Sequence, residues 1–140
     1  MKKKIFTSLG LMSGTSMDGV DLSVIKSDGF SKVEQIYNNY HKFDQILYEE
    51  LIQLRQLLNK SGDLKKNSKK ILEIEKKFTL FNSKLVKEAV IKTGLKIDMI
   101  GFHGQTILHL PKEKISIQLG DGNLLSQLSR SLVVNKFRQK

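Results

Sequence analysis

The hydrophobic pattern of the first 40 residues is that of extended strands. Residues 5–12 are apolar with interspersed small residues, and residues 20–24 alternate between aliphatic and polar side chains. A period of two is typical of a half-buried strand. A turn signal at Ser27–Gly29 precedes a further extended pattern over residues 33–40. The pattern predicts three strands joined by short turns, in an antiparallel meander.

The pattern changes to a helical period in the next 50 residues. One apolar stripe spaced by three and four comprises Phe43, Leu47, Leu51, Leu54 and Leu58. Polar residues and Gly62 interrupt it over residues 59–63, and a second stripe runs from Ile71 to Ala89. We expect two helices that bury these stripes in the core. The second should end near Thr93–Gly94, where glycine can adopt the left-handed conformation.

After Gly94 the pattern returns to strands. Residues 97–102 and 115–119 read as strands, and a further strand begins at residue 132. Between the last two, a turn at residues 120–123 precedes a short helical pattern, for which Asp121 is expected to be the cap rather than a ligand contact. The order β-β-β-α-α-β-β-α-β predicts a single α/β layer structure without repeats or linkers.

Composition narrows the function classes. The 140 residues contain no cysteine, which excludes disulfides and cysteine-bound zinc and fits a reducing cytoplasm. The lysine-rich N-terminus begins like a signal peptide, but glycines and Asp18 interrupt it before an adequate apolar stretch develops, and no apolar run is long enough for a membrane span. We therefore expect a soluble cytoplasmic protein that does not bind membranes.

The net charge of +10 invites a nucleic-acid interpretation, which we do not favour. Lysine supplies 21 of the 24 cations, whereas recognition of bases and phosphates usually draws on arginine. The densest basic stretch, residues 60–77, also contains three acidic residues and no aromatic residue. A solvated helix face explains this stretch better than a nucleic-acid patch.

Residues 11–21 (LMSGTSMDGVD) carry the most informative chemistry. Glycines allow backbone amides to approach a ligand closely, and successive amides in a turn form an anion-binding nest. The hydroxyls of Ser13, Thr15 and Ser16 can add donors to phosphate oxygens. Asp18 or Asp21 can hold a magnesium ion through water. This segment is therefore a candidate phosphate-binding loop between two strands.

Two other interpretations of this loop are weaker. Gly14 and Gly19 have the spacing of a Walker A loop, but Val20–Asp21 follows where Lys-Ser/Thr is required, and a strand rather than a helix comes next. A plain hairpin turn needs only Asp18–Gly19 and leaves the preceding Ser-Gly-Thr-Ser unexplained.

Two further segments offer polar side chains for a ligand. His103, Gln105 and Thr106 follow the end of a predicted buried strand, where functional residues often gather. They suit sugar hydroxyls, an amide or a carboxylate, although a structural histidine beside a turn is an equally good interpretation. Arg138 can bind a carboxylate with both ends of its guanidinium, but an arginine this close to the end of the sequence is usually only solvated.

Together these segments resemble the anhydro-N-acetylmuramic acid kinases. Residues 12–21 (MSGTSMDGVD) resemble that family's N-terminal signature, and residues 102–106 (FHGQT) resemble its second block. Residues 118–121 (QLGD) with Asn123 resemble a third block, and Val133–Val134 with Phe137–Arg138 a fourth. The order and spacing of the blocks agree along essentially the whole chain.

The resemblance implies an α/β fold of the actin/hexokinase/Hsp70-like (ribonuclease H-like) type, with a mixed sheet and flanking helices. Residues 1–140 would form a single N-terminal lobe without the second lobe. The implied enzyme is a bacterial ATP- and Mg²⁺-dependent kinase. It opens 1,6-anhydro-N-acetylmuramic acid with water and phosphorylates the 6-oxygen, in the recycling of peptidoglycan. Family members are typically homodimers.

By the same resemblance, the residues that bind ATP phosphates are Gly14, Thr15, Ser16, Met17, Asp18, Gly19, Val20 and Asp21. Those that contact the sugar are His103, Gln105 and Arg138. The metal ligands are not identified beyond Asp18 or Asp21 through water. The family's catalytic base lies beyond Lys140, so we expect no catalytic residue within this sequence and little or no activity from it alone.

One residue departs from the family pattern. The fourth block usually reads Asp-Phe-Arg, whereas residues 136–138 read Lys-Phe-Arg. A cation in place of an anion beside the sugar site can alter hydrogen bonding there or reorient Arg138. The alternative to a kinase lobe is a non-catalytic module that retains sugar or phosphate binding, and a nucleic-acid binder is the third hypothesis.

Overall fold

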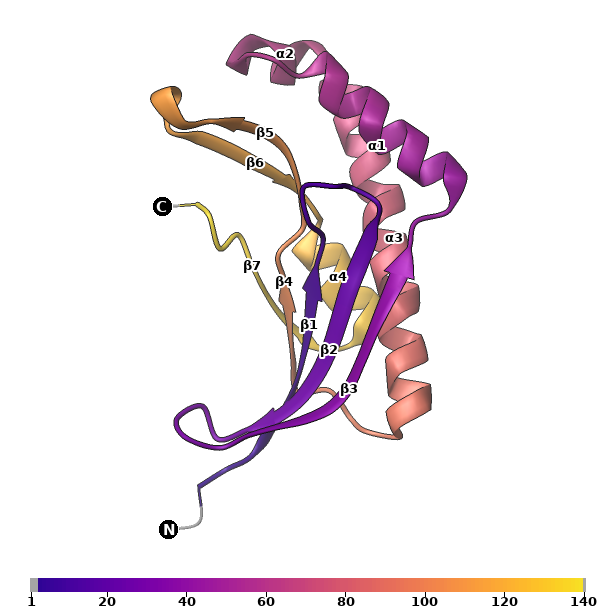
Figure 1. Ribbon diagram of the computed structural model, residues 1–140, viewed down its shortest axis with the longest axis vertical. Helices are drawn as coiled ribbons and strands as arrows, with labels where there is room; N and C mark the ends of the chain where they lie inside the picture. The colour runs from indigo at the N-terminus through magenta and orange to yellow at the C-terminus, as the bar shows by residue number, and fades with distance from the viewer. Residues whose placement is uncertain (1–2, 140) are drawn as a thin grey trace.

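A five-stranded mixed sheet forms the centre of the molecule in the computed structural model, which describes residues 3–139 (Figure 1). Strands β1 (Phe6–Met12), β2 (Gly19–Ser27) and β3 (Val33–Lys42) form the predicted antiparallel meander. Strands β4 (Met99–Phe102) and β7 (Leu132–Asn135) run parallel to β1, which gives the order β3-β2-β1-β4-β7.

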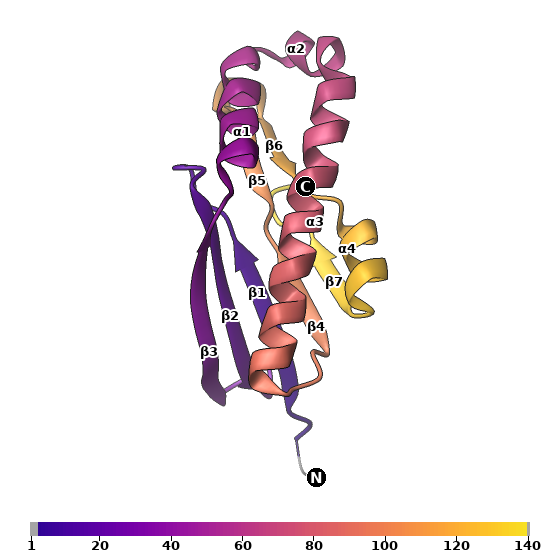
Figure 2. The ribbon, with the colours of Figure 1, turned by 90° about the vertical axis from the view of Figure 1, so that its right-hand side faces the viewer.

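The helices cover one face of this sheet. Figure 2 shows α3 (Ser68–Thr93) and α4 (Gly122–Ser129) lying side by side in front of the strands. Helix α1 (Gln45–Leu57) packs against α3, and the short α2 (Ser61–Lys66) connects the two. The core between the layers is built from the predicted apolar stripes, including Leu51, Leu54, Ile74, Phe78, Leu85 and Ala89, packed with Leu9, Val24 and Ile100 of the sheet.

Two predicted helix ends are confirmed by their backbone geometry. Gly94 follows α3 with φ of 65° and donates its amide hydrogen to the carbonyl of Val90, so glycine ends this helix in the left-handed conformation. Asp121 precedes α4, and its side chain accepts a hydrogen bond from the amide of Leu124 at 2.9 Å. Asp121 is therefore a helix cap, as the sequence indicated.

The cap of α1 provides a direct test of local stability. The Asp44 carboxylate accepts a hydrogen bond from the amide of Leu47 at 2.9 Å. We expect Asp44→Ala to lower the free energy of unfolding by about 1 kcal/mol, because the amide loses its acceptor at the helix start. Asp44→Ser, which keeps an acceptor, should stay near wild type in urea denaturation. Equal stability of wild type and the alanine variant would contradict this assignment.

Two elements differ from the sequence prediction. Residues 59–63 were expected only to interrupt the helices, yet α2 begins at Ser61, without a buried residue of its own. The strand β5 (Gln105–Leu110) was not predicted. It pairs antiparallel with the predicted β6 (Ile115–Leu119) across the single turn of 3₁₀ helix at Pro111–Glu113, forming a separate two-stranded sheet next to α1.

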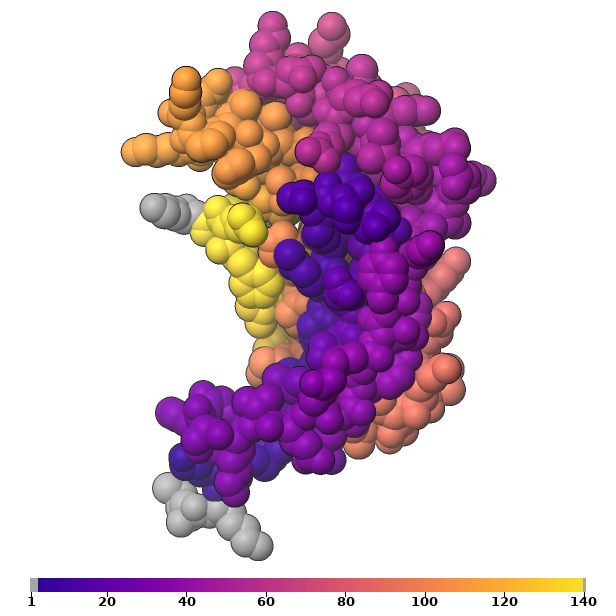
Figure 3. All heavy atoms as spheres, viewed as in Figure 1, coloured from indigo at the N-terminus to yellow at the C-terminus, as the bar shows by residue number. Residues whose placement is uncertain are grey.

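The other face of the central sheet is left open, and Figure 3 shows the molecule hollowed on that side. Small residues lie at its centre, since Gly10 is in register with Gly101 on one side and Ser23 on the other. Because β1 and β4 are parallel, both end at the same edge of the sheet, where the candidate site lies. Within residues 3–139, no helix is long and apolar enough to cross a membrane.

Candidate phosphate and sugar site

The candidate phosphate loop, residues 13–18, leaves the end of β1 and returns into β2. Its middle residues Thr15 and Ser16 are exposed, whereas the side chain of Met17 is fully buried. Met17 has φ of 57° and donates its amide hydrogen to the Gly14 carbonyl at 3.2 Å. The buried methionine anchors the loop to the core and leaves its outer backbone facing solvent.

The outer backbone of this loop has free donors. Among residues 3–139, no acceptor is paired with the amides of Thr15 or Ser16. Exposed successive amides beside hydroxyl groups are suited to binding an anion. The loop contains six residues between the strands, so it is longer than the two-residue hairpin that Asp18–Gly19 alone would make.

Asp18 is held as a carboxylate at the end of the loop. Hydrogen bonds from the Ser16 hydroxyl, at 2.7 Å, and from Tyr40 lower the pKa of Asp18 below its usual value. Partial desolvation raises the pKa of Tyr40, and the hydrogen bond to Asp18 and the charges of Asp18 and Asp21 raise it further. Both carboxylates therefore lie near the Tyr40 phenol. The sequence did not single out Tyr40, which is more than 20 residues from the loop.

His103 and Arg138 meet directly, although 35 residues separate them in the sequence. The Arg138 Nε–H donates to His103 Nε2 at 3.0 Å, and His103 Nδ1 lies 3.0 Å from the carbonyl oxygen of Gly104. Since Nε2 accepts and a carbonyl can only accept, this geometry assigns the proton to Nδ1. The contact through Nε leaves the terminal guanidinium nitrogens of the exposed Arg138 free to bind an anion.

This geometry predicts the tautomer of His103. We expect ¹⁵N NMR of the imidazole to show protonated Nδ1 and unprotonated Nε2 at neutral pH. The partner of Nδ1 is a carbonyl, which needs a donor, and the partner of Nε2 is an N–H group, which needs an acceptor. Arg138→Met removes the donor to Nε2 and should weaken this preference. The exposed His109 serves as the control within the same spectrum. A protonated Nε2 at His103 in the wild-type protein would contradict the arrangement.

A groove of about 730 Å³ lies on the open face of the sheet, between Tyr40, which bonds Asp18, and His103, which bonds Arg138. Asp21 and Tyr40 line one part, Gly10 and Gly101 line the floor, and His103 with Phe137 lines the other part. Asp21 and Tyr40 on one side and His103 on the other thus face a shared space, while Asp18 and Arg138 are their neighbours outside the lining. The groove extends over an exposed surface and is large enough for a sugar-sized molecule.

The structure gives the remaining predicted residues unequal access to a ligand. The side chains of Met17 and Val20 are fully buried, so only their backbone could meet a phosphate. Gly19 lies where a Cβ would collide with the carbonyl of His41 and the Tyr40 hydroxyl, so this position requires glycine for packing. Gln105 is fully buried and faces the phosphate loop instead of the groove.

Lys136 adopts a backbone conformation that disfavours lysine. Its φ is 61° and it is exposed, directly before Phe137 and Arg138. Aspartate and asparagine tolerate the left-handed region better than other non-glycine residues. The aspartate that the family pattern usually has here therefore suits the backbone, independently of any contact with a ligand.

The donor set fits a magnesium ion that is held jointly with phosphates. No group of three or more His, Cys, Asp or Glu side chains that could hold a metal occurs in the described part of the chain. Asp18 and Asp21 are both exposed at the loop end. Magnesium keeps several waters and commonly uses one or two carboxylates together with substrate phosphates, which matches this pair.

Fold and site together define the class of protein. A β3-β2-β1-β4-β7 mixed sheet with helices packed on one face, and a glycine- and hydroxyl-rich hairpin loop between its first two strands, has the fold of an actin/hexokinase-like N-terminal lobe. A family model described as anhydro-N-acetylmuramic acid kinase matches residues 6–140. The chain belongs to the anhydro-N-acetylmuramic acid kinase family.

Curated relatives agree with this family. A protein of Pelagibacter ubique named anhydro-N-acetylmuramic acid kinase is 53% identical over 98% of this chain. Proteins with the same name from Agrobacterium fabrum and Rhodopseudomonas palustris are 37% and 35% identical, over 96% and 94% of the chain. The chain spans 36–37% of the length of these relatives.

Proposed function

We propose that this chain is the phosphate-binding lobe of an ATP-dependent kinase that acts on 1,6-anhydro-N-acetylmuramic acid. The complete enzyme would open the anhydro ring with water and transfer a phosphoryl group to the 6-oxygen, yielding N-acetylmuramic acid 6-phosphate in the cytoplasm during peptidoglycan recycling. One observation carries the proposal. The Thr15–Ser16 backbone is exposed and has free amides, and it lies at the same edge of the sheet as the His103–Arg138 pair.

The phosphate loop has the groups needed to bind the nucleotide. The amides of Thr15 and Ser16 and the hydroxyl of Thr15 would donate to phosphate oxygens, while the Ser16 hydroxyl stays with Asp18. Asp18 is ionised at neutral pH, as an ordinary aspartate is, and its hydrogen bonds lower its pKa further, so it cannot donate to phosphate and would repel it directly. A cation between the carboxylate and the phosphates removes that repulsion, so Asp18, with Asp21, would hold Mg²⁺ through water. Bound Mg²⁺-ATP supplies the phosphoryl group and neutralises charge during its transfer.

The His103–Arg138 pair would bind the sugar at the other part of the groove. The exposed guanidinium of Arg138 is suited to the lactyl carboxylate, and His103 holds Arg138 Nε in place. Asp18 is occupied by Ser16 and Tyr40, so it is not suited to activate the water as a base. We assign no catalytic base to these residues. In the complete kinase that base would come from another part of the enzyme.

Binding and turnover test the proposal separately. Amide NMR of the purified chain should show saturable shifts near His103 and Arg138 with 1,6-anhydro-N-acetylmuramic acid. Arg138→Met, which removes the partner of His103, should abolish them, whereas Arg130→Met, a change at the end of α4, serves as the matched control. A coupled assay should detect no sugar-dependent ADP release from this chain alone. Robust phosphorylation would overturn the expected inactivity, and unchanged sugar binding by Arg138→Met would overturn the sugar assignment.

A further inference from the structure

Gln105 is the most deeply buried polar side chain at the site, with an exposed fraction of 0%. It begins β5, on an element separate from the phosphate loop. Both ends of its amide have partners. The oxygen accepts from the Ser13 hydroxyl, while Nε2 donates to the carbonyls of Gly14 at 3.0 Å and Thr106 at 3.4 Å. This arrangement leaves little hydrogen-bonding capacity for a ligand.

The partners of Gln105 connect both ends of the phosphate loop. The Ser13 hydroxyl also contacts the carbonyl oxygen of Gly19 at 2.9 Å. This contact links the first residue of the loop, Ser13, to the first residue of β2, Gly19. Removing the Gln105 amide would leave the buried Ser13 hydroxyl and the Gly14 carbonyl with fewer partners. The Ser13 hydroxyl would keep the Gly19 carbonyl and the Gly14 carbonyl would keep the Met17 amide, so the loop would be held by fewer hydrogen bonds and would be freer to move.

The geometry of the peptide unit gives this contact a consequence for binding. In a trans peptide, the carbonyl of one residue and the amide hydrogen of the next point in opposite directions. Gln105 Nε2 holds the Gly14 carbonyl, which also accepts from the Met17 amide, so the Thr15 amide of that same peptide is directed away from Gln105. Since Thr15 is exposed, its amide faces solvent on the side where a phosphate can approach.

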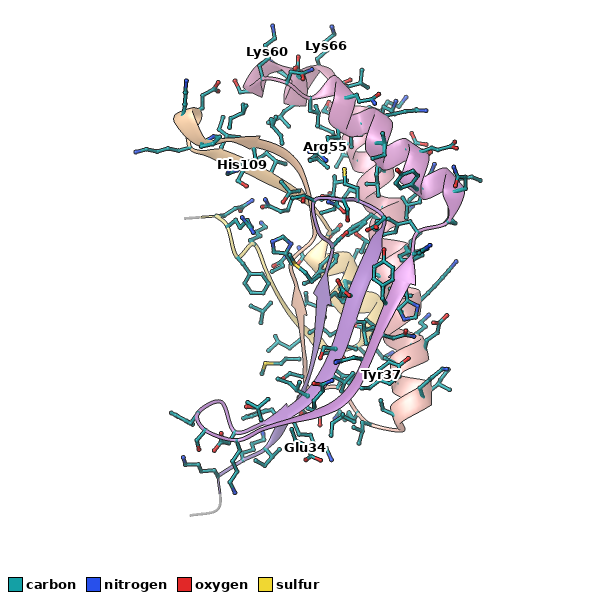
Figure 4. All side chains as sticks on the ribbon, in the orientation of Figure 1. Glu34, Tyr37, Arg55, Lys60, Lys66 and His109 are labelled. Atoms are coloured by element: carbon teal, nitrogen blue, oxygen red, sulfur yellow. The ribbon has the colours of Figure 1, made fainter. Side chains whose placement is uncertain are left out.

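Arg55 acts on the next peptide in the same manner. Its Nη1 donates to the Thr15 carbonyl at 3.0 Å, which directs the Ser16 amide away from Arg55. Figure 4 shows Arg55 between α1 and the β5–β6 hairpin, next to the β1–β2 loop. Two consecutive carbonyls are thus held by side chains from two other elements, and the two free amides belong to those two peptides.

We propose that Gln105 is a positioning residue that orients the Thr15 peptide for phosphate binding, with Arg55 orienting the Ser16 peptide. This inference rests on the proposed function and assigns Gln105 to the phosphate loop instead of the sugar. A loop oriented before binding has less conformational entropy to lose when the ligand arrives. Gln105 contributes to affinity through the backbone, without touching the ligand.

The test compares Gln105→Met with Gln118→Met. Methionine preserves side-chain length and removes the amide. Gln118 is a matched control, because it lies on the adjacent β6 and bonds Thr106 and Ser116 without touching the phosphate loop. The probe is pyrophosphate with Mg²⁺, titrated by calorimetry. We expect Gln105→Met to bind it about tenfold more weakly, which corresponds to about 1.4 kcal/mol, and Gln118→Met to bind like wild type.

Amide NMR without ligand separates this inference from the proposed function. Gln105→Met should shift the Thr15 amide resonance and increase the mobility of the Thr15 backbone. This result is expected without ligand, so it tests the inference even if the wild-type chain does not bind pyrophosphate. Arg55→Met, at an exposed position, should shift the Ser16 amide and provides the test where Gln105→Met fails to fold. Unchanged Thr15 and Ser16 resonances would overturn the inference. So would a Gln105→Met variant that loses sugar binding while retaining its pyrophosphate affinity.

Discussion

Phe78→Ala is expected to lower the free energy of unfolding by about 3–5 kcal/mol, the range found when a large aromatic side chain is removed from a packed core. Phe78 is 1% exposed on α3. Its ring stacks on Phe102 with centroids 6.0 Å apart and meets the edge of Phe43 at 5.9 Å. It therefore connects the long helix to the strand that ends beside His103.

Leu72→Ala is the control for this substitution. Leu72 lies on the same helix but is 65% exposed, and its loss should change stability by less than about 0.5 kcal/mol. Urea denaturation followed by circular dichroism measures both variants. A cost for Phe78→Ala as small as that of Leu72→Ala would show that α3 does not pack on the sheet through this residue.

Gly104→Ala should cost about 3 kcal/mol and disturb the site directly. Gly104 has φ of 81°, and a Cβ there would collide with the carbonyl oxygen of Leu119 on β6. The left-handed conformation alone costs a non-glycine residue about 1–2 kcal/mol. Relieving the collision requires moving β6 relative to the turn that holds His103 and Gln105, and overpacking of this kind adds about 1–3 kcal/mol.

Gly29→Ala isolates the contribution of the crowding. Gly29 has nearly the same φ, 76°, but among residues 3–139 no atom outside its chain neighbours lies within 4 Å of a Cβ built on it. Its alanine variant should therefore lose only about 1 kcal/mol, the cost of the backbone conformation. Equal losses in the two variants would show that the β4–β5 turn adapts freely, and that Gly104 is required only for its φ.

Strands and helices with a regular spacing of hydrophobic residues could be predicted from the sequence. Alternation identified the meander, the spacing of leucines identified α1 and α3, and Gly94 and Asp121 marked helix ends that the structure confirms. The missed strand β5 lacks such a pattern. Its pairing with β6 shifts register between Thr106 and Leu108, and both Ile107 and Leu108 are buried, so apolar residues do not alternate. The short α2 has no apolar stripe to detect.

The phosphate loop could be predicted from the sequence, whereas the side chains that contact it from other elements could not. The loop at residues 13–18 was apparent from its composition, because glycines and hydroxyls gather there. The contacts of Gln105 were not, since Ser13 and Gly14 lie 92 and 91 residues away in the sequence. The parallel pairing of β1 with β4 brings these segments together. Arg55 and Tyr40 carry no local signal, and only the packing of α1 and β3 places them beside the loop.

We propose above all that the exposed Thr15–Ser16 backbone of the phosphate loop binds nucleotide phosphates. The most direct measurement is an amide NMR titration of the purified chain with ADP and Mg²⁺. We expect saturable shifts of the Thr15 and Ser16 amides, reproduced by pyrophosphate and absent with adenosine, while exposed amides of α2 stay unchanged. Saturation without any shift at Thr15 and Ser16, or no response to either phosphate compound from a well-dispersed spectrum, would contradict it.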